Sequence, residues 1–302
     1  MPEQPPERRS TFSPPTVLQE SPEKSTTFLL LDDLYQHKVP HSPQLFTVSL
    51  GISIFSIFIS AKLFAAHSGV VSVTFAVLGI LPTFSIIVDR HKTKLLELNK
   101  EGQKRTAADL RFARNLFAIV MGILLAFSAW ALFLPVEQFQ TIFASQLGPR
   151  LGLSVSNYEH QSWLSITINN MAVLGGTLIL TLFFRLGGAL LVLAWNASVW
   201  GVVFVYFAKA QAATGALALF SYALIFSAVI PHVVLETLGY ILAALSGILI
   251  LRCIVRGRQK EQSMRKEIQP IVYILLVATT CIALGALIEI KLAPFLLSTL
   301  GF

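Results

Sequence analysis

Residues 112–134 read FARNLFAIVMGILLAFSAWALFL, and Pro135 follows directly. From Asn115 to Leu134 this stretch carries no charged side chain. A helix of about 20 apolar residues is long enough to cross a bilayer, whereas a strand of a membrane barrel needs only about 10 residues of alternating character. Because helices and closed barrels alone satisfy their own backbone polar groups in hydrocarbon, the stretch predicts a transmembrane helix.

The whole chain has the same character. Of its 302 residues, 54% are hydrophobic and only 13% are charged, and its mean hydropathy is +0.69. A soluble domain carries about 25% charged residues, so the composition excludes a water-soluble globular protein and a disordered one. We therefore expect an all-α, polytopic transmembrane helical bundle of about seven spans. The other candidate spans are 45–66, 69–88, 163–184, 188–208, 231–251 and 270–293.

The basic residues predict the orientation of the chain. Residues 89–114 hold eight Lys and Arg against four acids, and residues 252–268 hold six against two. By the positive-inside rule both segments are cytoplasmic, which also places the N-terminus in the cytoplasm. A docking surface for anionic lipid head groups is the alternative interpretation. Nucleic-acid binding is not expected, because no aromatic interleaving accompanies the charge.

A short apolar segment, 214–230, conflicts with this orientation if it crosses the membrane. A full crossing there would place the basic residues 252–268 outside. We therefore expect 214–230 to be a re-entrant segment that dips into the membrane and meets a new helix beginning at Pro231. Broken helices at membrane depth line a cavity or a protein-packed interior.

The spans divide the chain into four predicted regions. The first holds 8 of the 14 prolines and is expected to be a disordered cytoplasmic tail. The loop between the third and fourth spans has apolar residues at helical spacing, which predicts an interfacial helix. In order, the regions are the tail 1–44, a three-span region 45–134, an extracytoplasmic loop 135–162 and a C-terminal membrane domain 163–297.

Six polar side chains stand in apolar surroundings and form a predicted intramembrane polar cluster. An acid at mid-bilayer costs about 2.5–3.5 kcal/mol on insertion scales, so each should be buried against protein. His232 and Glu236 share a helix face, and that face continues through a stripe of small residues that lets another helix approach. The cluster is Asn169, Asn170, Asn196, His232, Glu236 and Glu289, and the helix-packing stripe is Gly239, Ala243 and Gly247.

The chemistry of this cluster stays open at the level of sequence. His232 and Glu236 could be a structural hydrogen-bonded pair, a proton- or ion-handling site, or part of a metal site. Zinc prefers three or four ligands rich in His or Cys, so we expect no metal and no cofactor. The asparagines could bond between helices, and Glu289 could pair with Lys291 at the membrane edge. Because no nucleophile elbow, phosphate loop or HExxH motif occurs, the chain is not expected to be an enzyme.

The order of motifs in the C-terminal half resembles a known family. Asn169-Asn170 is followed by Trp195-Asn196, then by Pro231-His232-Val-Val-Leu-Glu236 and finally by Ile288-Glu289. This order, over about residues 160–297, resembles the stage II sporulation protein M family of integral membrane proteins. That family shows an Asn-Asn helix, an Asn-Gly helix, a Pro-His-Gly-x-x-Glu segment and a closing Ile-Glu span. Here Ala197 and Val233 replace the two family glycines.

The resemblance implies a scaffold or assembly factor of the cell envelope, located in the plasma membrane of a bacterial cell and without catalytic chemistry. The founding member works with peptidoglycan-degrading partners during engulfment of the forespore and is not known as a catalyst. We therefore expect as partners the lipid bilayer, membrane or cell-wall-remodelling proteins and further copies in a homo-oligomer, and no nucleic acid. The alternatives are a transporter or permease that uses His232 and Glu236, and an intramembrane hydrolase with Glu236 as general base.

Overall fold

The computed structural model describes residues 41–100, 106–148, 162–211, 215–257 and 264–299, which contain helices and no strand. Six of these helices are long and apolar enough to cross a membrane. The prediction of an all-α membrane bundle is therefore confirmed. The elements are α2 (Ser42–Leu63), η1 (Ala65–His67), α3 (Ser68–Lys100), α4 (Thr106–Phe133), α5 (Val136–Ile142), α6 (Ala144–Leu147), α7 (Trp163–Gln211), α8 (Gly215–Gly257) and α9 (Met264–Thr299).

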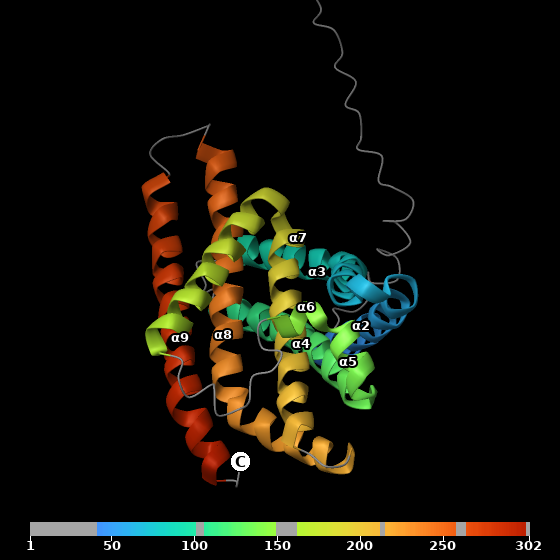
Figure 1. Cartoon of the computed structure of the whole chain (residues 1–302). Helices are drawn as coiled ribbons and strands as arrows, with labels where there is room; N and C mark the ends of the chain where they lie inside the picture. The colour runs from blue at the N-terminus through green and yellow to red at the C-terminus, as the bar shows by residue number, and fades with distance from the viewer. Residues whose placement is uncertain (1–40, 101–105, 149–161, 212–214, 258–263, 300–302) are drawn as a thin grey trace, which may run out of the picture. The chain divides into compact units, whose positions relative to one another are not determined.

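Helix α7 is a hairpin of two helical arms, which Figure 1 shows as a sharp fold in the yellow ribbon. The arms meet at Arg185, whose backbone angles of φ 52° and ψ −127° are not helical. A Cβ atom placed on Gly188 would lie 2.1 Å from the carbonyl oxygen of Leu180, so only glycine fits this close turn. The arms correspond to the predicted spans 163–184 and 188–208, and the six long helices thus hold the seven predicted spans.

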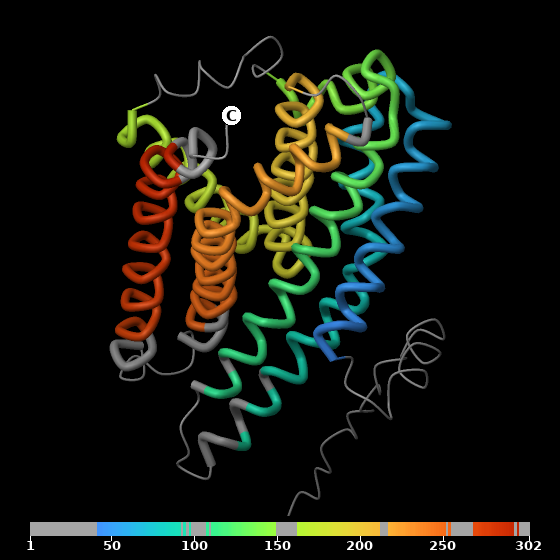
Figure 2. The backbone as a smooth tube through the Cα atoms, turned by 90° about the horizontal axis from the view of Figure 1, so that it is seen from below, coloured from blue at the N-terminus to red at the C-terminus, as the bar shows by residue number. Residues whose placement is uncertain are grey.

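Helix α8 differs from its prediction. The expectation that a new helix begins at Pro231 is wrong, because α8 runs without interruption from Gly215 to Gly257 with Pro231 inside it. A proline in a helix removes one hydrogen bond and bends the helix without necessarily ending it. Figures 1 and 2 both show α8 bent, with its first part directed toward the end of α7. That the segment 214–230 fails to cross the membrane stays a prediction.

The loop after α4 forms two short helices, α5 and α6, where the sequence predicts one. The apolar side chains of this segment, Phe139, Phe143 and Leu147, are at most 1% exposed, and α6 packs on α3 and α7. The apolar stripe thus contacts the protein's own helices, and a place at the membrane interface stays a prediction. The loop residues 149–161 and the predicted tail up to residue 40 lie outside the described residues.

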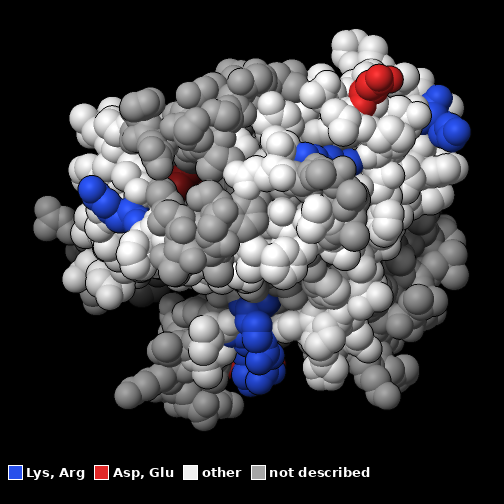
Figure 3. Space-filling view, turned by 60° about the horizontal axis from the view of Figure 1, so that its bottom comes forward, with Lys and Arg blue, Asp and Glu red and all other residues white. Residues whose placement is uncertain are grey.

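Helix α7 lies between two groups of helices, as both ribbon views show. Helices α2, α3 and α4 lie on one side of it and helices α8 and α9 on the other, and α7 contacts α3, α4, α8 and α9. Figure 3 shows one face on which the described surface is mostly uncharged. Large apolar side chains such as Phe133, Phe183 and Phe55 are exposed, as expected of a surface that faces lipid.

The hairpin turn in α7 yields a testable prediction. Replacing Gly188 by alanine should destabilise the protein by about 1–3 kcal/mol, because the added methyl group overlaps the Leu180 carbonyl. Gly187→Ala is the matched control, since a Cβ atom there has nothing within 4 Å. Thermal unfolding in detergent, followed by circular dichroism, measures both variants. Equal midpoints for the two variants would contradict the close turn.

Candidate functional site

The centre of the predicted polar cluster is a hydrogen bond between two helices. The side-chain amide of Asn170, in the first arm of α7, donates to Oε1 of Glu236 in α8 at 2.5 Å. Asn170 is 7% exposed and Glu236 is 3% exposed. A carboxyl group buried in a membrane segment needs such a donor, because lipid offers none. The bond therefore joins α7 to α8 through residues 66 positions apart.

Helix α9 closes this seam from the other side. A Cβ atom placed on Gly285 would lie 3.0 Å from Cγ of Glu236, so the backbone of α9 lies directly against the buried side chain. One turn later, Glu289 is near enough to Glu236 for the two side chains to interact electrostatically. The indole N–H of Trp163 donates to the carbonyl of Ala283 at 3.1 Å and joins α7 to α9.

Sequence reasoning missed two residues of this site. Tyr240 is 1% exposed and stacks on Trp200 with ring centroids 6.3 Å apart. Its signal in the sequence is its spacing, one helical turn after Glu236. Gly285 carries the same kind of signal on α9, because it lies one turn before Glu289.

His232 is buried but does not bond to Glu236. Its side chain is 4% exposed, and Nδ1 has no hydrogen-bond partner among the described residues. The imidazole ring instead meets the ring of Phe204, in the second arm of α7, edge to face at 6.4 Å. The hydrogen-bonded pair that the sequence allowed is thus not formed, although both side chains are in protein-packed surroundings as expected.

The other two asparagines differ in their positions. Asn169 is exposed, and its amide donates to Oδ1 of Asn170 at 3.3 Å. Asn196 donates to the carbonyl of Val192 in its own helix at 2.8 Å. Asn196 thus makes a local bond within α7, whereas Asn169 extends the network toward the surface of the arm.

The predicted packing stripe on α8 contacts two helices. A Cβ atom on Gly239 would lie 2.9 Å from the side chain of Ile282 in α9, and one on Gly247 would lie 2.8 Å from Thr181 in α7. Ala243, between them, is fully buried. The stripe therefore sets the close approach of α8 to both neighbours, and this approach brings Asn170 and Glu289 to Glu236.

This arrangement can hold three helices together, because α7 donates one hydrogen bond to Glu236 in α8 and another to the backbone of α9. Among the residues that the structure describes, no group of three His, Cys, Asp or Glu side chains could hold a metal ion.

Asn170→Ala should lower the free energy of unfolding by about 1–3 kcal/mol, because Glu236 then keeps its burial but loses its hydrogen-bond donor. Asn169→Ala is the matched control on the neighbouring, exposed residue and should cost about 0.6 kcal/mol or less, the average for such bonds in membrane proteins. Chemical unfolding in detergent measures both. A larger loss for Asn169→Ala than for Asn170→Ala would contradict the site.

Comparison with known protein families extends the resemblance beyond the region that holds the motifs. The family model described as Stage II sporulation protein M matches residues 112–294, which include all six residues of the predicted polar cluster. The match begins in α4, earlier than the motifs alone indicate, and leaves out α2 and α3. No curated protein and no solved structure matches the chain. Because the match covers more than half of the chain, this multi-pass membrane protein belongs to the stage II sporulation protein M family.

Proposed function

We propose that the protein is a scaffold or assembly factor of the bacterial plasma membrane, which holds cell-envelope-remodelling proteins together and catalyses no reaction itself. Membership of the family supports this role. We propose partners that act on the cell wall, with the chain's N-terminus in the cytoplasm. A scaffold needs a fixed arrangement of helices, because a surface that is already ordered loses less conformational entropy when a partner binds.

The observation that carries this proposal is the packing around Glu236. Glu236 accepts a hydrogen bond from Asn170 of another helix, and the backbone of α9 at Gly285 lies directly against its side chain. Polar groups in this arrangement fix three helices relative to one another. A path for a solute would instead need open space beside the same side chains.

Isolation from the native membrane tests the scaffold. The full chain is cross-linked in the membrane, solubilised in several mild detergents and purified, and the proteins recovered with it are identified. We expect envelope-remodelling proteins with the wild type, fewer of them with Asn170→Ala, and wild-type recovery with Asn169→Ala. Purification of the wild type without any such protein in every detergent would overturn the proposal.

The pairing of Glu236 with Glu289 favours a second candidate function, proton-coupled transport. Both acids lie in candidate membrane spans, and they interact electrostatically. Acids inside a membrane protein commonly mark proton relays. In this case the proton would exchange at the Glu236 carboxyl group, and the hydrogen bond from the Asn170 amide would keep that carboxyl group in place.

Glu236→Gln separates the two candidates. Glutamine keeps an oxygen that accepts the bond from Asn170 but cannot release a proton at neutral pH. If the protein is a transporter, liposomes with the wild type should show a proton flux that falls at least tenfold in Glu236→Gln. If the protein is a scaffold, the variant should keep its partners. Equal flux in the wild type and the variant would exclude the transporter.

A further inference from the structure

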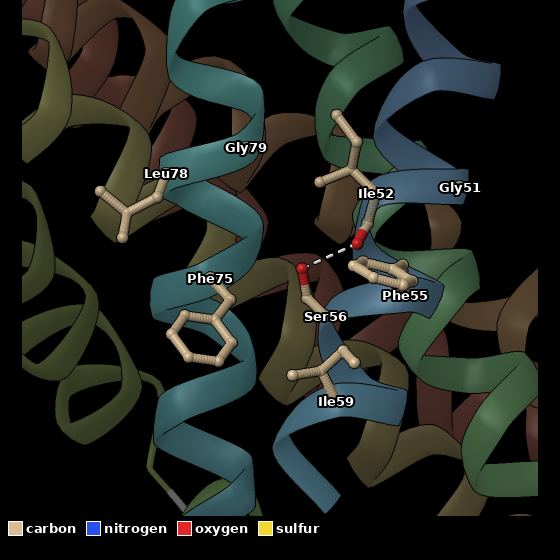
Figure 4. A pocket seen from close by; sticks show the side chains of 8 residues that line it. All are labelled: Gly51, Ile52, Phe55, Ser56, Ile59, Phe75, Leu78 and Gly79. Carbon is tan, nitrogen blue, oxygen red and sulfur yellow. Dashed lines mark hydrogen bonds between the residues drawn. The ribbon is translucent and has the colours of Figure 1, made fainter. Parts of the chain in front are cut away.

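A groove between α2 and α3 lies outside the region that the family model matches. Its volume is about 570 Å³, which is within the range of about 300–1,000 Å³ typical of small-molecule sites. Figure 4 shows the two helices side by side with the lining side chains between and beside them. The lining residues are Gly51, Ile52, Phe55, Ser56, Ile59, Phe75, Leu78 and Gly79.

The chemistry of the lining suits an apolar occupant. Seven of the eight lining residues are Gly, Ile, Phe or Leu, and Ser56 is the exception. The Ser56 hydroxyl donates to the carbonyl of Ile52 at 2.7 Å, which Figure 4 marks with a dashed line. The hydroxyl proton is thus already used within α2. Because α2 and α3 are both candidate membrane spans, the groove opens toward hydrocarbon.

Two glycines shape the groove in different ways. A Cβ atom on Gly79 would lie 2.7 Å from Cγ2 of Ile52, so this glycine lets the two helices touch. A Cβ atom on Gly51 would have nothing within 4 Å, so this glycine leaves the groove open. Phe55 and Leu78 are 66% and 59% exposed and stand at the rims.

A basic residue lies at one end of the groove. Gly51, Phe55, Ile59 and Lys62 follow one another at steps of three or four and therefore share one face of α2. Lys62 is exposed in the last turn of the helix. At 1.5 Å per residue, Gly51 and Lys62 are about 16 Å apart along the axis. This length is about half of the ~30 Å hydrocarbon thickness, which is the depth of one leaflet.

We propose that this groove binds one anionic phospholipid, with an acyl chain along the face from Ile59 to Gly51 and the phosphate beside Lys62. The apolar lining suits an acyl chain, and the open space at Gly51, where a Cβ atom would have nothing within 4 Å, leaves room for one. The ammonium group of Lys62 supplies the charge that an anionic head group requires.

Native mass spectrometry of the full chain tests this site. The protein is purified in detergent, supplied with phosphatidylglycerol and phosphatidylcholine of identical acyl chains, and scored for bound lipid and for oligomeric state. The wild type should retain one phosphatidylglycerol. Gly51→Leu fills the groove and should retain at least fivefold less. Lys62→Gln should lose about fivefold in its preference for phosphatidylglycerol, because one basic residue contributes about 1 kcal/mol of attraction to anionic lipid.

Gly175→Leu in α7 is the matched control, since a Cβ atom there also has nothing within 4 Å, and it should bind lipid like the wild type. Equal lipid retention in Gly51→Leu and the wild type, or an equal loss in Gly175→Leu, would overturn the proposal. A dimer that Gly51→Leu dissociates without a change in bound lipid would assign the groove to a second copy and would also overturn it. If Gly51→Leu does not fold, an unchanged lipid preference in Lys62→Gln overturns the proposal alone.

Discussion

A carboxyl group inside a membrane protein must find a hydrogen-bond donor within the protein, and the C-terminal helices meet this constraint at Glu236. Its donor, Asn170, comes from α7. The bond forms only if the first arm of α7 returns to α8 and if no side chain on α9 occupies the place of Gly285. The packing of these three helices and the polar contact between them therefore depend on each other.

The hairpin at Arg185 is what brings Asn170 to this position. Without the turn, α7 would continue as one helix of 49 residues, and its first arm would move away from α8. The turn is possible because Gly188 has no side chain where it faces Leu180. Gly239 and Gly247 then let α8 approach α9 and α7 closely enough for side chains on different helices to meet. Backbone shape and polar contact therefore depend on the same few glycines.

Much of the fold could be predicted from the sequence, because hydrophobic length is a strong signal in membrane proteins. The break at Arg185 could also be predicted, since a charge and two glycines interrupt the apolar pattern. The continuous course of α8 through Pro231 could not, because a proline ends some helices and only bends others, and packing against other helices decides between these outcomes.

The residues of the candidate site could be predicted from the sequence, but the contacts between them could be predicted only in part. Spacing placed His232 and Glu236 on one face, and both are buried. Helical spacing describes neighbours within one helix, however, and the partner of Glu236 comes from another. The ring of His232 packs against Phe204 and makes no hydrogen bond to Glu236. Tyr240 carries a phenol group and so falls outside a pattern of charged and amide side chains, although it stands one turn after Glu236.

Pro231 has a mechanical consequence for α8. Because proline has no N–H, the carbonyl of Ser227, four residues earlier, receives no bond from position 231. The ladder of backbone bonds is therefore interrupted next to His232, at the junction between the first part of the helix and the part that holds Glu236. The missing bond accounts for the bend of α8 without a break in the helix. Pro231 thus lets one continuous helix change direction directly before the part that holds Glu236.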